Sequence, residues 1–208
     1  MDFKYSCFLS YRNPLPVRGT SIAETLKEDL AREIKAYVDE PVFFDTERLK
    51  GGQFIHDTLA LALCESVCMI MLYTPSYFHE TQTFCTREYF GMKALEAERL
   101  ALAPSHDRGS GLIIPIIVRG ARFFPKTIRQ ERRAYDFQDY FLGAAPPKKS
   151  AYRRDLDEIA SYIRERHQML RRLPARPRPC EEFRLPAHSE ILTYIPSLLS
   201  TPDVMPRV

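Results

Sequence analysis

The 208-residue sequence lacks the patterns that mark several large classes of protein. No apolar run approaches the roughly 20 residues that a transmembrane helix requires. The opening residues, MDFKYSCFLSYR, do not have the layout of a signal peptide, because their apolar part is short and interrupted. We therefore expect a cytoplasmic protein that does not enter a membrane. The net charge of +3 is also too small to predict nucleic-acid binding.

Motifs for metals and for the common nucleotide loops are missing as well. The five cysteines form no CxxC pair and no Cys/His cluster with zinc spacing, so we expect no metal site. Cysteines inside apolar runs are expected to be small buried hydrophobes. There is no GxGxxG or Walker lysine pattern, and we expect no resident cofactor. A Cys-His nucleophile stays open in principle, but nothing places a histidine near Cys85.

The composition predicts one globular domain, residues 1–170, and an extension, residues 171–208. Hydrophobic residues make up 45% of the chain and charged residues 27%, which is ordinary for a folded domain. The extension begins LRRLPARPRPCEEFRLP, whose proline and arginine content predicts an extended tether. Its arginines favour a solvated linker over nucleic-acid contact, because no aromatic residue interleaves with them. The apolar segment 191–199 leaves docking on the domain open.

Strand-like and helix-like segments alternate along the domain. Strands are expected at residues 5–11, 42–44, 67–73, 111–118 and 135–141, and helices at residues 21–38, 55–63, 84–101 and 150–170. This alternation predicts a flavodoxin-like three-layer α/β/α fold with a central parallel five-stranded sheet. Pro115 lies inside the fourth strand and argues for an edge position or a bulge there.

Residues 66–91, SVCMIMLYTPSYFHETQTFCTREYFG, organise the rest of the chain. A buried strand ends at Thr-Pro-Ser, and the helix that follows places Phe84 and Glu88 one turn apart on one face. Ligands of open parallel sheets bind at the edge where such strands end. Two alternatives remain open, namely that Phe84 is plain core and that Glu88 is a solvated carboxylate near the helix dipole. The neighbouring face, expected to pack inward, carries Cys85, Tyr89 and Met92.

Three segments share the order and spacing of a known family's signature boxes. They are FLSYR in the first strand, VFFD followed by LKGG after the second, and TPSY followed by the FCxxE helix. Together they resemble a TIR (Toll/interleukin-1 receptor) domain of the bacterial stand-alone type, over roughly residues 1–170. The residues that resemble the BB loop of that family are Leu49, Lys50, Gly51 and Gly52.

The resemblance implies one of two functions. Animal receptor and adaptor TIR domains are mainly interaction modules, whereas many bacterial, plant and axonal ones cleave NAD⁺ at the nicotinamide-ribose bond. A glutamate on the third helix is essential in the enzymes, and Glu88 matches it, while Phe84 falls where many bacterial enzymes carry tryptophan. Asn13 departs from enzymes that have a second arginine there. Substrate-binding roles are implied for Phe8, Ser10, Arg12, Asp45 and Phe84.

The chemistry implied by the resemblance needs only one carboxylate. Nicotinamide in NAD⁺ is already cationic and leaves without a proton, so no general acid is required, unlike in ordinary glycosidases. A carboxylate such as that of Glu88 can orient the ribose and stabilise an oxocarbenium-like transition state. NAD⁺ is then the substrate, and no cofactor is implied.

Free-standing proteins of this kind resemble the sensor of Thoeris-type antiphage defence, which converts NAD⁺ into a signalling nucleotide for a separate effector. Self-association through TIR-TIR contacts is also implied, because a second copy often completes the site. Simple NAD⁺ depletion is the rival enzymatic hypothesis, and a catalytically silent adaptor is the rival from another class. A related deoxyribosyltransferase is disfavoured by FLSYR and by the glycines of the loop.

Overall fold

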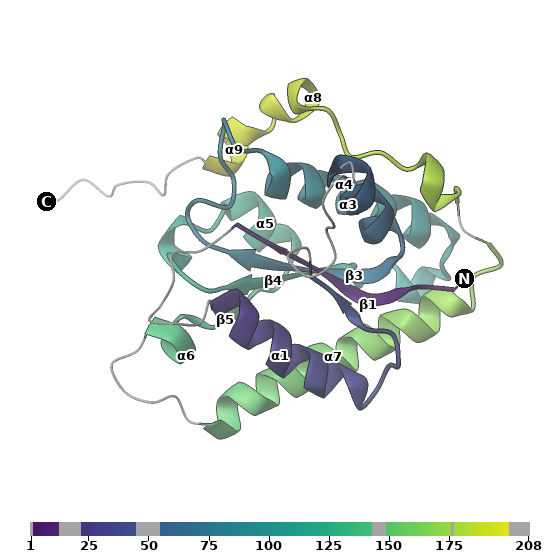
Figure 1. Cartoon of the computed structure of the whole chain (residues 1–208), viewed down its shortest axis with the longest axis horizontal. Helices are drawn as coiled ribbons and strands as arrows, with labels where there is room; N and C mark the ends of the chain where they lie inside the picture. The colour runs from purple at the N-terminus through teal and green to yellow at the C-terminus, as the bar shows by residue number, and fades with distance from the viewer. Residues whose placement is uncertain (1, 13–21, 45–54, 143–148, 176, 200–208) are drawn as a thin grey trace, which may run out of the picture.

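A five-stranded parallel sheet forms the centre of the molecule (Figure 1). The computed structural model describes residues 2–12, 22–44, 55–142, 149–175 and 177–199. The strands lie in the order β2-β1-β3-β4-β5 and all pair in parallel. Their bounds are β1 (Tyr5–Tyr11), β2 (Val42–Phe43), β3 (Ser66–Tyr73), β4 (Ile113–Ile117) and β5 (Tyr135–Asp136). This strand order confirms the predicted flavodoxin-like topology.

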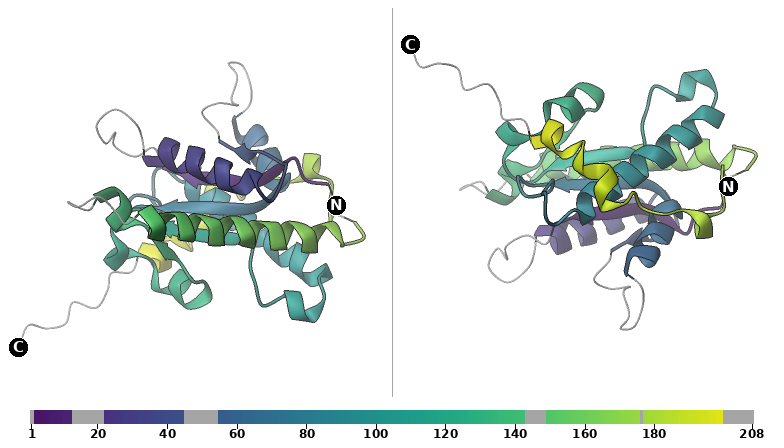
Figure 2. Two further views of the ribbon diagram at one scale, coloured as in Figure 1. Left: turned by 90° about the horizontal axis from the view of Figure 1, so that it is seen from below. Right: turned by 90° about the horizontal axis from the view of Figure 1, so that it is seen from above.

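Helices cover both faces of the sheet, as Figure 2 shows. One face carries α1 (Ile22–Lys35) and α7 (Lys149–Arg171), which pack against each other. The other carries α3 (Ile55–Cys64) and α4 (Phe84–Leu102). Shorter elements complete the fold: η1 (Ser105–Asp107), η2 (Ala121–Phe123), α5 (Lys126–Glu131), α6 (Gln138–Leu142), η3 (Cys180–Glu182), α8 (His188–Leu192) and α9 (Ile195–Leu199). The three-layer α/β/α prediction is therefore confirmed.

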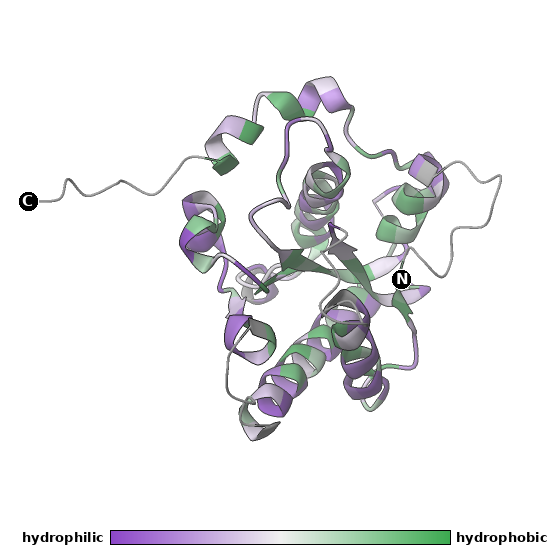
Figure 3. Cartoon of the chain, turned by 60° about the vertical axis from the view of Figure 1, so that its left-hand side comes forward, coloured by the Kyte–Doolittle hydropathy of each residue, from purple (hydrophilic) through white to green (hydrophobic). Residues whose placement is uncertain are grey.

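The core lies between the sheet and these two helical layers. All of β3 is buried, as expected for a central strand covered on both faces. Helix α1 contributes Leu26, Leu30 and Ile34, which recur at helical spacing and are almost completely buried. Figure 3 shows the same division, with strongly hydrophobic strands at the centre and a mixture of hydrophilic and hydrophobic residues along the surrounding helices. Within the described ranges, no helix has the length and apolar character to cross a membrane.

Two local predictions in the second half of the sheet are wrong. The last strand is limited to Tyr135–Asp136, and Gln138–Leu142 is helix rather than strand. The Asp136 carboxylate explains this change, because it accepts a hydrogen bond from the backbone N–H of Gln138 at 3.1 Å and turns the chain. Strand β4 is not an edge strand despite Pro115. The ladder to β5 begins only at Ile116, so no β5 residue is paired with the proline.

The predicted tether instead packs onto the domain. It follows the outer side of α4, with α8 and α9 beyond it (Figures 1 and 2). Its buried side chains are Leu173, Cys180, Phe183, Leu185, Ile191, Ile195 and Leu198. The open question of docking by residues 191–199 is thus answered, because Ile191, Ile195 and Leu198 are buried. One arginine of this segment, Arg178, forms an ion pair with Glu98 on α4.

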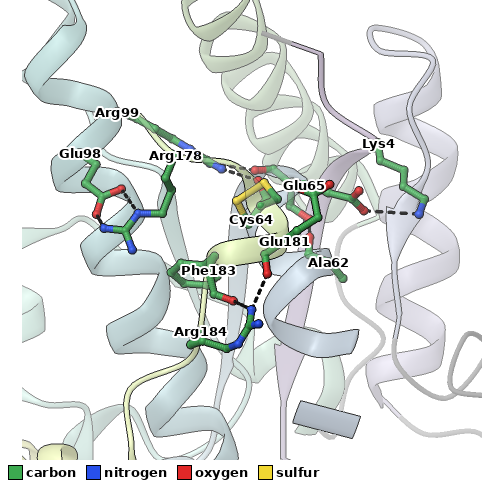
Figure 4. The surroundings of a disulfide bond; sticks show 12 residues. Lys4, Ala62, Cys64, Glu65, Glu98, Arg99, Arg178, Glu181, Phe183 and Arg184 are labelled. Carbon is green, nitrogen blue, oxygen red and sulfur yellow. Dashed lines mark hydrogen bonds and ion pairs between the residues drawn. A yellow bond between two sulfur atoms is a disulfide. The ribbon is translucent and has the colours of Figure 1, made fainter. Parts of the chain in front are cut away.

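A disulfide fixes this segment to the domain (Figure 4). It joins Cys64, at the end of α3, to Cys180 in η3. Next to it the buried guanidinium of Arg99 donates to the carbonyls of Cys64 at 2.6 Å and Ser66 at 2.9 Å, which satisfies backbone acceptors between α3 and β3. The other cysteines, Cys7, Cys68 and Cys85, are buried and form no disulfide, as expected of small hydrophobes. Sequence spacing gave no sign of the disulfide.

Candidate functional site

The candidate site lies where the carboxyl ends of β1 and β3 separate. These two strands are neighbours in the sheet, but the chain leaves β1 for α1 on one face and leaves β3 for α4 on the other. Such a change of direction opens a crevice outside the strand ends, where ligands of open α/β sheets bind. Ser10 lies near the end of β1, and Glu88 lies at the start of α4. The topology therefore brings two residues predicted from the sequence to this point.

Glu88 is held within the fold. Its residue surface is only 6% exposed, and its Oε2 accepts a hydrogen bond of 2.6 Å from the Ser10 hydroxyl. Ser10 is 1% exposed, and its Oγ lies 2.5 Å from the hydroxyl of Tyr77. A buried carboxylate needs hydrogen-bonding partners to remain charged. The alternative that Glu88 is a solvated surface carboxylate is therefore wrong.

Tyr77 joins the site from the loop between β3 and α4. The chain turns after β3, and the backbone N–H of Tyr77 donates to the Thr74 carbonyl at 2.9 Å. The turn directs the Tyr77 side chain into the interior, where it is fully buried. Burial raises the pKa of the Tyr77 hydroxyl well above its ordinary value of 10.0, so the phenol stays protonated. Tyr77 lies in the TPSY motif, but the sequence gave it no role in the site.

Phe84 lies on the surface rather than in the core. Its residue surface is 45% exposed, which rules out the alternative that it is plain core. The Phe84 ring stacks on the imidazole of His56, with 5.1 Å between centroids and 10° between planes. His56 Nδ1 in turn lies 2.9 Å from Arg87 Nη1, so it accepts from that guanidinium. Arg87 also donates from Nε to the Pro186 carbonyl at 2.6 Å, which connects this surface to the C-terminal segment.

Arg12 holds the loop that carries Tyr77. Its Nη1 donates to the carbonyl of Ser76 at 2.6 Å, and its Nη2 donates to Gln82 Oε1 at 2.5 Å. These two acceptors lie on either side of Tyr77 in the loop sequence. The guanidinium is thus used to connect the end of β1 to the β3–α4 loop. Its predicted role in binding substrate stays a prediction.

The remaining predicted site residues are not brought to Glu88 by described contacts. Phe8 is 1% exposed and stacks on Phe43 with 5.1 Å between centroids, which places its ring in the core. Its predicted contact with substrate stays a prediction that this burial does not favour. Asp45 and the predicted BB loop, residues 49–52, lie outside the described residues. The same holds for Ser21, expected to cap the first helix.

No metal-binding group of three or more His, Cys, Asp or Glu side chains occurs among the described residues. A cavity of about 280 Å³ lies at the start of β4 and β5, at the sheet edge away from Glu88, and its lining includes Arg132, Tyr135 and Glu158.

Cys85 is buried beside Tyr89 and Met92 on the inward face of α4, as predicted. A buried thiol in this position acts as a packing residue.

Comparisons with known proteins give little further information. No protein-family model matches the chain, and no curated protein matches it. A solved structure that resembles it shows the TIR domains of the activated Roq1 resistosome directly recognizing the pathogen effector XopQ. The two sequences are 20% identical, the match covers 76% of this chain and 84% of that one, and the TM-score is 0.36. A TM-score this low does not establish a family, so an argument for function rests on the site itself.

Proposed function

We propose that this protein is a TIR-type enzyme that cleaves the nicotinamide-ribose bond of NAD⁺. The observation that carries the proposal is the position of the Glu88 carboxylate at the β1/β3 crevice, where Ser10 holds it one helical turn from the exposed ring of Phe84. An anchored carboxylate and an accessible aromatic ring are what a cationic nucleotide substrate requires. The resemblance of the signature boxes quoted above to those of TIR domains supports the proposed family.

Glu88 acts on the ribose in this proposal. Departure of neutral nicotinamide leaves positive charge on the sugar, and a carboxylate held in a dry site stabilises that charge more strongly than one in water. The Ser10 hydrogen bond fixes the carboxylate before the substrate arrives, so little reorganisation is needed during reaction. No proton has to reach the leaving group, and a second carboxylate is therefore unnecessary.

Phe84 and His56 supply a stacking surface for a ring of the substrate. The two rings are already parallel, which leaves the other face of Phe84 for a third ring. Arg12 maintains the loop beside the site and adds a positive charge near the end of β1. A nucleotide pyrophosphate is attracted by such a charge.

The proposed biological role is antiphage signalling of the Thoeris type. The enzyme, in the cytoplasm, would convert NAD⁺ into an ADP-ribose-derived nucleotide that activates a separate effector, and copies of the chain would associate through their TIR surfaces. Simple NAD⁺ depletion uses the same chemistry and differs only in the fate of the product. In the cytoplasm, the Cys64–Cys180 disulfide would be transient or redox-sensing, because disulfides in a reducing cytosol are usually of these kinds.

A silent adaptor is the second candidate, and the burial of Glu88 favours it. With 6% of its surface exposed, the residue offers little area to a ligand in the described chain. In that case Ser10 and Glu88 would only stabilise the fold, and exposed side chains such as Phe84 would bind a partner protein.

Product chromatography after incubation with NAD⁺ separates the two candidates. The purified chain is assayed over a range of protein concentrations, so that self-association is sampled, and also in lysate of phage-infected cells that express it. Release of nicotinamide supports the enzyme, and the accompanying product peak distinguishes linear ADP-ribose from a cyclic isomer or conjugate. Absence of release under all of these conditions overturns the enzymatic proposal and favours the adaptor.

A further inference from the structure

We propose that Tyr77 is a positioning residue, which orients the Glu88 carboxylate through the hydroxyl of Ser10. The inference rests on the proposed function and adds to it a residue to which the motifs give no role. It is carried by two short hydrogen bonds in series, Tyr77 to Ser10 at 2.5 Å and Ser10 to Glu88 at 2.6 Å. All three residues are buried, so water does not replace either bond.

The direction of both hydrogen bonds follows from the protons available. The single hydroxyl proton of Ser10 is donated to the Glu88 carboxylate. The Ser10 oxygen is therefore left as an acceptor, and the Tyr77 phenol must donate to it. Each donor polarises the next, so the Tyr77 bond strengthens the one that Ser10 makes to the carboxylate. Tyr77 thus acts on Glu88 without touching the substrate.

The three side chains come from three different elements. Ser10 belongs to β1, Tyr77 to the loop after β3, and Glu88 to α4. Tyr77 is fixed by its backbone bond to Thr74 and by edge-to-face packing on Phe78, with 4.9 Å between ring centroids. The hydrogen-bonded series therefore sets the position of the α4 carboxylate relative to the end of the sheet.

Arg12 supports the same arrangement by holding the loop that carries Tyr77. It donates to Ser76 and Gln82, which lie before and after Tyr77 in the chain. The end of β1 thus contributes both Ser10, which contacts Glu88, and Arg12, which holds the loop of Tyr77. This explains why FLSYR, TPSY and FCxxE occur together: each supplies one part of a single hydrogen-bonded unit.

The test compares Tyr77→Phe with Tyr73→Phe in steady-state NAD⁺ cleavage. Both changes remove one hydroxyl from a buried ring, and Tyr73 donates to the Phe123 carbonyl at 2.6 Å instead of to Ser10. We expect Tyr77→Phe to lower kcat roughly 10-fold or more, as for the loss of a hydrogen bond in a charge-assisted series, with KM nearly unchanged. Tyr73→Phe should leave kcat within about two-fold of wild type, because it does not act on Glu88.

A second comparison tests whether Tyr77 acts through Ser10. Ser10→Ala removes the central hydroxyl, and adding Tyr77→Phe to Ser10→Ala should then cause no further loss of kcat. Thermal melting of every variant shows whether the fold is kept. Losses in Tyr77→Phe and Ser10→Ala that multiply in the double variant would overturn the positioning role.

The outcomes separate this inference from the proposed function. A wild type that releases nicotinamide and a Tyr77→Phe variant as active as Tyr73→Phe overturn the positioning role and leave the enzyme intact. A wild type that releases none overturns both. A kcat loss confined to Tyr77→Phe, with unchanged KM and no additivity with Ser10→Ala, supports the inference.

Discussion

The rings of Phe84 and His56 lie parallel at 5.1 Å, although Phe84 remains 45% exposed. The pair joins the start of α4 to the start of α3, and Arg87 holds the edge of the imidazole by donating to its Nδ1. A ring that is exposed and yet fixed in orientation suits the binding of another planar group.

Phe84→Ala should therefore weaken substrate binding more than it affects the fold. We expect KM for NAD⁺ to rise roughly 10-fold, since stacking of a base on an aromatic ring is worth about 1–3 kcal/mol. Phe84→Trp should retain or lower KM because it enlarges the stacking face. Steady-state kinetics check this prediction, with Phe123→Ala as control, because Phe123 is similarly exposed at 43% but belongs to η2. An equal KM for Phe84→Ala and wild type would contradict it.

Glu96 and Arg132 form a buried ion pair that stabilises the domain. The guanidinium contacts both carboxylate oxygens, at 2.8 and 2.5 Å, and both side chains are about nine-tenths buried. Glu96→Gln should lower the free energy of unfolding by about 3–5 kcal/mol, because it leaves a buried charge without its partner. The exposed pair Lys93–Glu131 joins neighbouring positions, so Glu131→Gln, expected to cost about 1 kcal/mol or less, is the matched control. Equal losses in urea unfolding would contradict this account.

The Cys64–Cys180 disulfide should hold the C-terminal segment on the domain. Cysteines 116 positions apart are joined, so reduction frees a long loop in the unfolded chain. Reductant or Cys180→Ser is expected to lower the free energy of unfolding by about 2–5 kcal/mol and to expose the segment around η3 to protease. Reductant should have no further effect on Cys180→Ser. Unchanged melting of wild type under reductant would show that the bond is absent or without effect.

Alkaline pH should destabilise the protein through its buried tyrosines. Burial raises the pKa of Tyr73 from 10.0 to about 12, so the folded chain keeps this proton to higher pH than the unfolded chain. The contribution of Tyr73 is then complete below pH 10 and is lost as the pH rises from about 10 to 12. Denaturant unfolding across this range should show a smaller pH slope in Tyr73→Phe. Identical slopes would contradict a raised pKa.

Much of the fold could be predicted because the sequence pattern is local and regular. The continuous apolar run that forms β3 and the apolar stripe along α1 each indicate burial directly. The alternation of strands and helices predicts a parallel sheet. The short helix Gln138–Leu142 could not be predicted in this way, because it depends on one side-chain contact from Asp136. The packing of residues 171–199 depends on contacts distant in sequence, and Cys180 gives no local sign of its partner.

The sequence predicted some residues of the candidate site but none of their contacts. Helical spacing placed Phe84 and Glu88 on one face, and the family motifs added Ser10 and Arg12. Burial of Glu88, the use of Arg12 to hold a loop and the participation of Tyr77 all depend on how three elements meet. Phe8 was predicted from its place in a motif, whereas strand geometry directs its ring into the core beside Phe43.

The most direct test of the account is release of nicotinamide from NAD⁺ by wild type and by Glu88→Gln. The amide has nearly the shape of the carboxylate and can accept from Ser10, so the fold should be retained, which thermal melting verifies. Without the negative charge, the oxocarbenium-like transition state loses its stabilisation, and we expect turnover to fall at least about 1,000-fold. A Glu88→Gln variant that releases nicotinamide at the wild-type rate would contradict the central claim.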